Sequence, residues 1–301
     1  DMTHDLQHGS ILGGVAVVPD LAAALRDYRD ILGMSVVEQG VLPANLAESW
    51  GCPESSGAPM ATLQPASGAD CHIRLVEQPD RYDFKPTTSF GWAAFELSVQ
   101  DVFGWPDRLE GSGFDVVGPP KELAGMPYFV PMQVLGTGRE MVYLNEVREN
   151  TPSSDLPKAL SPTDHIFIVI LAAVDRAATV QWYCDHILLT EADTYTLAYS
   201  MINAAFDKPA NTLSVLTMVQ NGRLPIIEVD DYPVEATVRG RHDGMLPPGN
   251  ALVSLAVDDL DMIDVEWITA PQKRDAAPYG GRRTATTVGP AGELLELIEI
   301  A

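Results

Sequence analysis

Two residues able to do chemistry stand on apolar strands in the second half of the chain. His165 heads the apolar stretch 161–171, and Glu296 lies in the last strand, 292–300. Side chains alternate along a strand, so Glu296 shares its side with Leu294 and Ile298, the pattern expected for a cavity carboxylate. An imidazole and carboxylates that converge can hold a divalent cation, and a buried carboxyl can act as a general base. The alternative is a hydrogen-bonded strand histidine and a satisfied, buried acid.

Composition excludes some partners. The 301 residues carry 19 Lys and Arg against 42 Asp and Glu, a net charge of −23. So acidic a chain repels phosphate backbones and anionic lipid, which argues against nucleic-acid and membrane partners.

Three cysteines without a CxxC spacing predict reduced thiols and a cytoplasmic location. We expect neither a leader nor a membrane-spanning segment, and nucleotide-binding, hydrolase and zincin motifs are absent.

One pattern of elements occurs four times. Each copy has a strand, a helix introduced by an aspartate, and three further strands; the aspartates are Asp20, Asp101, Asp175 and Asp259. The offsets between half-chains, 155 residues from Asp20 to Asp175 and 158 from Asp101 to Asp259, are nearly equal. This indicates duplication of a module and then of the pair. Residues 149–163, rich in proline, predict a linker between an N-terminal domain, 1–148, and a C-terminal domain, 164–301.

Three segments carry a family resemblance. Residues 17–33 (VVPDLAAALRDYRDILG) resemble the first module of the vicinal oxygen chelate superfamily, and residues 255–260 (LAVDDL) and 292–296 (GELLE) resemble the first and last strands of another module. That superfamily includes glyoxalase I, bleomycin-resistance proteins, extradiol dioxygenases and some epimerases. The resemblance implies an α+β fold in which four βαβββ modules pair, in chain order, into two glyoxalase-like domains with curved mixed sheets.

The resemblance also implies that metal ligands stand on the first and last strands of both modules in a pair. In the first pair none of the residues at these positions suits a metal; they are Gly13, Arg74, Ala94 and Val142. We therefore expect no metal site in the N-terminal domain.

In the second pair the same positions offer one imidazole and two carboxylates. They hold His165, Glu228 and Glu296, with Leu252 where many relatives have histidine. This set suits Fe, Mn, Zn or Ni, or it holds no metal and Glu228 or Glu296 acts as the catalytic base.

The position of His165 conflicts with the spacing of the module. Counting back seven residues from Asp175 reaches Ile168, so either the loop is longer or His165 is not the ligand. His242 is either a replacement ligand or an exposed loop residue. A roof over an apolar cavity, or ordinary core packing, is predicted for Tyr195, Tyr199, Met201 and Phe206.

These observations favour a glyoxalase- or dioxygenase-like enzyme, a lyase, isomerase or dioxygenase. It would act on a small, partly apolar oxygenated molecule in the C-terminal cavity, with a cation as Lewis acid. The alternatives are a metal-free binding protein of the bleomycin-resistance type and a metal-free isomerase or lyase. Each half can complete its pair within one chain, which fits a monomer as well as a homodimer.

Overall fold

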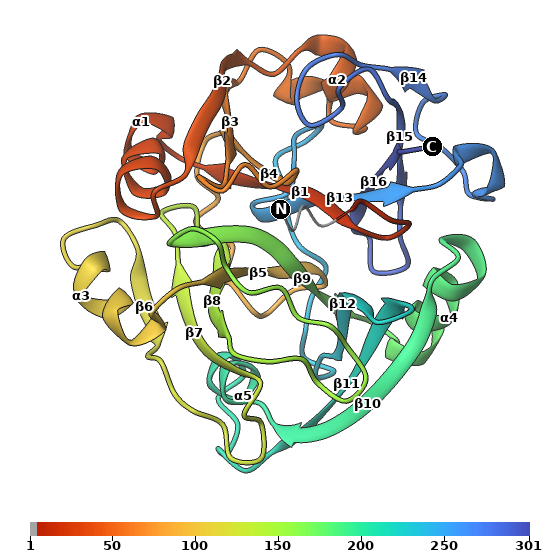
Figure 1. Ribbon diagram of the computed structural model, residues 1–301. Helices are drawn as coiled ribbons and strands as arrows, with labels where there is room; N and C mark the ends of the chain where they lie inside the picture. Colours follow the sequence, from red (N-terminus) through yellow and green to blue (C-terminus); the bar gives the residue numbers. More distant parts are fainter. Residues whose placement is uncertain (1–4) are drawn as a thin grey trace.

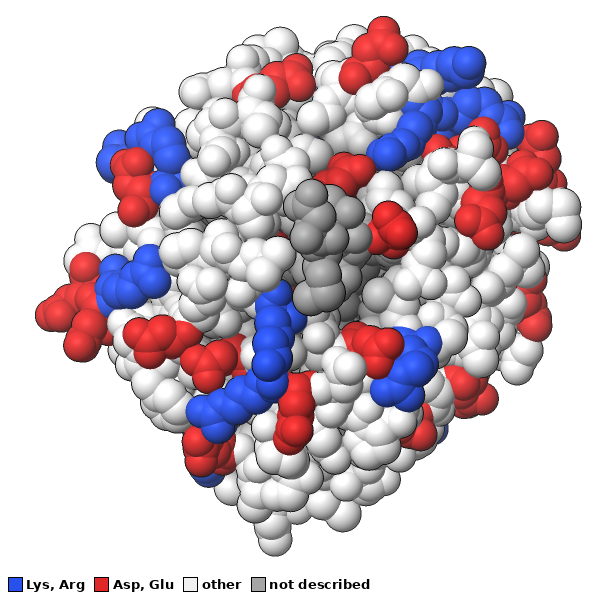
Figure 2. All heavy atoms as spheres, viewed as in Figure 1, with Lys and Arg blue, Asp and Glu red and all other residues white. Residues whose placement is uncertain are grey.

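The computed structural model describes residues 5–301, which form two mixed sheets of eight strands each (Figure 1). The predicted α+β fold of four βαβββ modules is confirmed. No helix among the described residues is both long and apolar enough to cross a bilayer. On the face shown in Figure 2, acidic side chains are scattered over both sheets with basic ones among them.

The first sheet combines the first and fourth modules in the order β14-β15-β16-β13-β1-β4-β3-β2. The first module contains β1 (Ile11–Val18), α1 (Leu21–Leu25) with a π-helical turn (Arg26–Ile31), β2 (Ser35–Val41), α2 (Ala44–Ser49), a 3-10 turn (Pro53–Ser55), β3 (Pro59–Gln64) and β4 (His72–Glu77). The fourth contains β13 (Gly249–Val257), a 3-10 turn (Leu260–Met262), β14 (Gln272–Lys273), β15 (Arg283–Val288) and β16 (Leu294–Glu299).

The second sheet combines the second and third modules in the order β10-β11-β12-β9-β5-β8-β7-β6. The second module contains β5 (Gly91–Val99), a 3-10 turn (Val102–Gly104), α3 (Trp105–Leu109), β6 (Asp115–Gly118), β7 (Phe129–Leu135) and β8 (Met141–Val147). The third contains β9 (Thr163–Ala173), α4 (Arg176–His186), β10 (Thr190–Ala198), α5 (Ser200–Ala205), β11 (Leu213–Asn221) and β12 (Leu224–Asp231).

The pairing of modules differs from the prediction. The sequence predicts consecutive pairs in domains 1–148 and 164–301, but β1 lies antiparallel to β13, and β5 to β9. Segment 149–163 therefore joins two strands of one sheet and is not a linker between domains. The repeat shows which modules are alike, but strand pairing is a long-range contact that the repeat does not encode.

The chain crosses between the sheets twice, and the two crossing segments are joined to each other. Ser89 and Thr237 form a parallel bridge. The buried guanidinium of Arg239 donates to the Ser89 hydroxyl at 2.9 Å and to the carbonyls of Trp92 at 2.8 Å and Asn250 at 3.0 Å. Arg239 thus holds both crossings against the strands that follow them.

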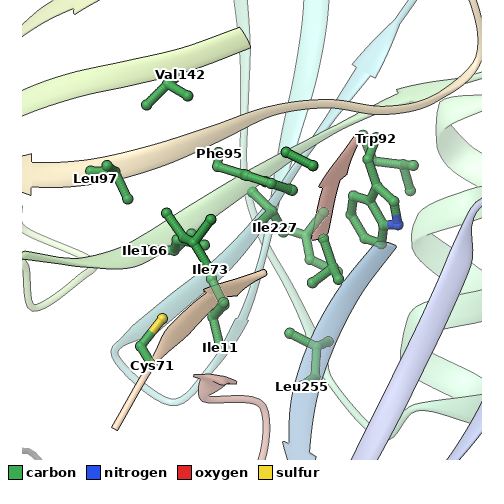
Figure 3. Close-up of a cluster of buried hydrophobic side chains, with 14 of the residues drawn as sticks. Ile11, Cys71, Ile73, Trp92, Phe95, Leu97, Val142, Ile166, Ile227 and Leu255 are labelled. Carbon is green, nitrogen blue, oxygen red and sulfur yellow. The ribbon is translucent and has the colours of Figure 1, made fainter. Parts of the chain in front are cut away.

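The main core lies between the sheets. Figure 3 shows Phe95 from β5 packed among aliphatic side chains that include Ile73 from β4 and Leu255 from β13. The packing is so close that a Cβ on Gly14 would lie 2.6 Å from the Phe95 ring, which explains the glycine in β1. The packing around Phe95 and Gly14 therefore leaves no room for a ligand in this part of the core.

Three of the four aspartates introduce their helical segments as predicted. Asp20, Asp175 and Asp259 each accept a hydrogen bond from a backbone N–H two or three residues later. Asp101 differs, because its backbone is left-handed, with φ of 50°, and its side chain caps nothing.

Two buried tyrosine–glutamate pairs tie the sheets together. Tyr28 donates to Glu140 at 2.8 Å, and Tyr183 donates to Glu293 at 2.9 Å. Each tyrosine lies in the helical segment of a module in one sheet. Each glutamate lies in the turn between the last two strands of a module in the other sheet. Burial raises the pKa of both Glu140 and Glu293 to about 7, although hydrogen bonds from the tyrosines and from backbone N–H groups oppose this rise.

These pairs predict a stability that falls as the pH rises. In the unfolded chain a glutamate has a pKa near ~4.3, so the folded state binds extra protons between ~4.3 and about 7. Their stabilising contribution is complete below the unfolded pKa and is lost as the pH rises through the folded pKa. The difference between ~4.3 and about 7 is roughly 2.7 pKa units, so at roughly 1.4 kcal/mol for each unit each carboxyl contributes on the order of 4 kcal/mol.

The double variant Glu140→Gln/Glu293→Gln is expected to flatten this dependence. Urea unfolding followed by circular dichroism from pH 5 to pH 8 measures it, with the exposed substitution Glu38→Gln as control. A slope in the double variant as steep as in the parent chain would show that these carboxyls are not its source.

Candidate functional site

Each sheet has one face packed on the other sheet and one face turned away from it. We call the outward faces the first cup and the second cup. The first cup is defined on the first sheet by Gly13, Val15, Arg74, Leu252, Ser254, Leu294 and Glu296. The second cup is defined on the second sheet by Ala94, Glu96, Met141, Tyr143, Ile168, Ile170 and Glu228.

A buried ion pair occupies the first cup. Arg74 lies 2.9 Å from Glu296, and each side chain is 1% exposed. Glu296 also accepts hydrogen bonds from the Ser254 hydroxyl at 2.7 Å, the Trp50 indole at 2.8 Å and the Tyr279 hydroxyl at 2.8 Å. The guanidinium lies over both aromatic rings, 5.0 Å from the centroid of Trp50 and 5.2 Å from that of Tyr279.

The charge state of Glu296 follows from these partners. Burial by itself would raise its pKa, but Arg74 and the hydrogen bonds from Ser254, Trp50 and Tyr279 outweigh burial and lower the pKa below its ordinary value. Glu296 is therefore an ionised, fully satisfied group. Of the roles that the sequence left open for Glu296, its surroundings correspond to the buried, hydrogen-bonded acid.

The second cup has carboxyl groups of a different kind. Glu228 on β12 accepts a hydrogen bond from the Tyr199 hydroxyl at 3.3 Å, and Tyr199 lies 2.9 Å from the Tyr143 hydroxyl. The Asp230 carboxyl, two residues along the same strand, hydrogen-bonds Glu228. Oδ1 of Asp230 is buried, and no N–H or hydroxyl group of residues 5–301 donates to it.

Burial and mutual repulsion keep protons on this cluster. Burial raises the pKa of Asp230 well above its ordinary value, and the neighbouring Glu228 raises it further. Glu96 on β5 is raised by burial and by Glu228, although the amide of Asn145 donates to it at 2.7 Å. Burial also raises the pKa of Glu228, against hydrogen bonds from Asp230 and Tyr199. Asp230 thus holds a proton that it donates to the Glu228 carboxylate.

The second cup is open to solvent at Glu228, whose side chain is partly exposed. A cavity of about 10 Å³, lined by Tyr143, Tyr199, Asp230 and Tyr232 among others, lies beside it. This is room for about one water molecule.

The predicted roof residues reach the second cup only in part. Tyr199 lines the cavity and Met201 packs against the Ala94 cluster. Phe206 stacks edge-on against Tyr232, whereas Tyr195 is 39% exposed on β10. His242 lies in the second crossing segment, 3.2 Å from the Pro79 carbonyl and outside the cup.

His165 lies elsewhere. It lines a cleft of about 720 Å³ that lies between residues 5–11, the turn at 67–71 and segment 155–167. Its Nδ1 is 3.2 Å from the buried carboxylate of Asp164. The cup-facing residue of β9 is Ile168, opposite Glu96, and a bulge separates it from His165. The count of seven residues back from the helix cap is thus the correct register.

This chain resembles known proteins both in sequence and in fold. Residues 11–130 match the family model described as the Glyoxalase/Bleomycin resistance protein/Dioxygenase superfamily. The fold is similar to that of glyoxalase I from Zea mays, with a TM-score of 0.61 at 15% identity over 96% of this chain and 92% of that chain. The sequence match covers residues 11–130, so this part of the chain resembles that superfamily, and the structural similarity extends the likeness in fold to the rest of the chain.

A second whole-chain similarity supports the same fold. A proposed dioxygenase from Bacillus subtilis strain 168 gives a TM-score of 0.60 at 12% identity over 98% of this chain and 86% of that chain. The search of curated proteins gives no match.

Vicinal oxygen chelate folds imply a metal, and the donors of neither cup suit one. In the first cup the last-strand position of the first module is Arg74, a cation that repels metal ions. In the second cup the first-strand positions Ala94 and Ile168 carry no donor. Among residues 5–301 no three His, Cys, Asp or Glu side chains converge as a metal site.

The predicted ligand set His165, Glu228 and Glu296 is therefore not assembled. Glu228 belongs to the second cup, Glu296 to the first, and His165 to the cleft. The prediction placed the third and fourth modules in one sheet, and their separation moves Glu228 and Glu296 apart.

The sequence analysis did not identify three residues of the second cup, Tyr143, Glu96 and Asp230. Tyr143 is one residue beyond the predicted position, Val142, which faces the core between the sheets. Glu96 and Asp230 lie two residues from predicted positions, on the same strand faces. An acid inside an apolar strand, as in 91–99, was the signal available for Glu96.

The ion pair of the first cup predicts a strongly coupled mutant cycle. Removal of one partner leaves a buried charge, so Arg74→Met or Glu296→Leu alone is expected to destabilise the protein by about 3–5 kcal/mol. The double variant Arg74→Met/Glu296→Leu removes both charges and is expected to cost much less than the sum of the single substitutions. Urea unfolding of the four proteins gives the coupling energy, and additive effects would contradict a direct pair.

Proposed function

We propose that this protein is a vicinal oxygen chelate enzyme that moves protons on a small, partly apolar oxygenated molecule bound in the second cup, as an isomerase or lyase does. The observation that carries the proposal is the arrangement of Glu228. It is a partly exposed carboxylate, backed by the protonated Asp230 and touched by the Tyr199 hydroxyl. The first cup offers no comparable group, because Glu296 is saturated with hydrogen bonds.

Glu228 is suited to the role of base. Burial raises its pKa, so its conjugate acid is weaker and the carboxylate is a better proton acceptor than an exposed glutamate. The hydrogen bond from Asp230 keeps Glu228 ionised while the proton remains in the pair. Glu228 would take a proton from a carbon next to a carbonyl, and the electron pair of that C–H bond would move onto the carbonyl oxygen.

The tyrosines are suited to stabilise that oxygen. Burial raises the pKa of Tyr199 and Tyr143 well above the ordinary value, so both hydroxyls stay protonated and donate hydrogen bonds. A substrate oxygen in the cavity would compete with Glu228 for the Tyr199 hydrogen. Return of the proton from Glu228 to an adjacent carbon gives an isomer, and departure of a β-substituent gives a lyase product.

A binding protein without chemistry is the second candidate. The observation that favours it is the narrow cavity, about 10 Å³, which gives a reacting molecule little room unless Tyr199 moves. Binding and proton transfer are separated by whether substrate carbon exchanges hydrogen with the solvent.

Hydrogen exchange in D₂O tests the proposal. Hydroxyacetone, acetoin and phenacyl alcohol would be incubated with the protein, and loss of the proton next to the carbonyl followed by NMR. Glu228→Gln is expected to lower the exchange rate by ~10²–10⁴-fold and Tyr199→Phe to lower it less, because the base is essential and the donor assists. The rate of the parent protein is expected to rise with pH through the raised pKa of Glu228.

Glu38→Gln, an exposed change of the same type in the first sheet, serves as the control and leaves the rate unchanged. Full exchange activity in Glu228→Gln would refute its role as base. Compounds that bind without exchanging would favour the binding protein.

A further inference from the structure

The two cups are equivalent in position and can be compared residue by residue. Val15 and Ile170 each lie five residues before the aspartate that introduces the next helix. Their neighbours on the last strands are Arg74 and Glu228. Glu228 therefore stands in the second cup where Arg74 stands in the first.

The remaining equivalent positions complete the comparison. Ser254 and Glu96 also lie five residues before their aspartates, and their last-strand neighbours are Glu296 and Tyr143. In the first cup a serine and a glutamate surround an arginine. In the second cup a glutamate and a tyrosine surround a second glutamate.

The charges of the two cups differ accordingly. The first cup holds one cation and one carboxylate, which neutralise each other. The second holds the carboxyls of Glu96, Glu228 and Asp230, and within residues 5–301 no lysine or arginine forms an ion pair with any of them. The buried Arg239 does not neutralise them, since its N–H groups go to the Ser89 hydroxyl and to backbone carbonyls.

A residue that lines the cavity of the second cup carries a buried acceptor without a donor among the described residues. The Asp230 side chain lines this cavity and is 1% exposed, and its Oδ1 atom has no hydrogen-bond partner. A buried acceptor without a donor costs about 1–3 kcal/mol, so it marks a place where a donor is missing.

We infer that the ligand of the second cup carries a cationic nitrogen group, an ammonium, amidinium or guanidinium, which takes the place that Arg74 takes in the first cup. The inference rests on the site given under the proposed function and adds the class of molecule bound there. The N–H groups of such a cation donate to Asp230 Oδ1 and to Glu228. Its charge offsets the carboxyl cluster.

The aromatic surroundings fit the same group. In the first cup the rings of Trp50 and Tyr279 lie about the guanidinium. The cavity of the second cup is lined by Tyr143, Tyr199 and Tyr232, whose ring faces attract cations. Because the cavity measures about 10 Å³, the cation enters when the Tyr199 side chain moves, and Tyr199 precedes the short helix α5 without capping it.

A pair of isosteric probes tests the charge. n-Propylguanidinium is the arginine side chain as a free molecule, and n-propylurea has nearly the same shape without the charge. Binding to the full chain at pH 8 would be followed by backbone NMR shifts and by calorimetry. We expect shifts at Tyr143, Glu228 and Asp230 and a dissociation constant at least tenfold lower for n-propylguanidinium.

Variants locate the binding. Glu228→Gln is expected to raise the dissociation constant of n-propylguanidinium about tenfold and to leave that of n-propylurea unchanged. Asp230→Asn serves as a second variant if Glu228→Gln fails to fold, as judged by circular dichroism. The control Glu38→Gln makes the same change of charge on the exposed surface of the other sheet and leaves both constants unchanged.

Three outcomes would overturn the inference. These are equal affinity for the two probes, no shift in the second cup with either probe, and saturable paramagnetic broadening of the cup by Mn²⁺ alone where n-propylguanidinium has no effect. The proposed proton transfer is judged separately, by exchange into uncharged carbonyl compounds. Exchange that depends on Glu228 together with equal probe affinities would refute only the cationic ligand.

Discussion

The antiparallel contact between first strands is the constraint on which both cups depend. β1 lies beside β13 and β5 beside β9, and each contact places two modules in one continuous sheet. Only this arrangement brings Arg74 to Glu296 across 222 positions of sequence. The same arrangement leaves Glu228 in the other sheet, beside Ile170 and across β9 from Glu96.

The two cups have the same strand arrangement but differ in how their buried charged side chains are paired. In the first, Arg74 and Glu296 neutralise each other beside Trp50 and Tyr279, although Arg74 Nε has no hydrogen-bond partner in the part of the chain that the structure describes. In the second, carboxyls are left with raised pKa values and Asp230 with an unsatisfied oxygen. Buried polar groups without partners lower stability, and proteins retain them where function requires them. The proposed site in the second cup is supported instead by its carboxyls, which no lysine or arginine within residues 5–301 pairs with, whereas Arg74 pairs with Glu296 in the first cup.

The sequence predicts what is local and misses what is long-range. Apolar runs and the aspartates at 20, 175 and 259 placed the strands and helical segments correctly, because both signals act within a few residues. The spacing of the repeat gave the modules and the equivalent positions. It could not show which modules are neighbours, since four similar modules can pair in more than one way. His165 was misplaced although the spacing from Asp175 indicated Ile168, and a bulge in β9 separates the two residues.

The path of the chain also connects the two cups directly, through the segment that joins β12 to β13. Segment 232–248 follows Asp231, the last residue of β12 and the neighbour of Asp230, and ends at β13, which carries Ser254 of the first cup. Arg239 holds this segment to Trp92 at the start of β5 and to Asn250 in β13. A loss of order around Ser254 would therefore reach the residues next to Asp230 through a short, clamped piece of chain. Two domains joined by a free linker would lack this connection, and it gives the ion pair of the first cup a bearing on the geometry of the second.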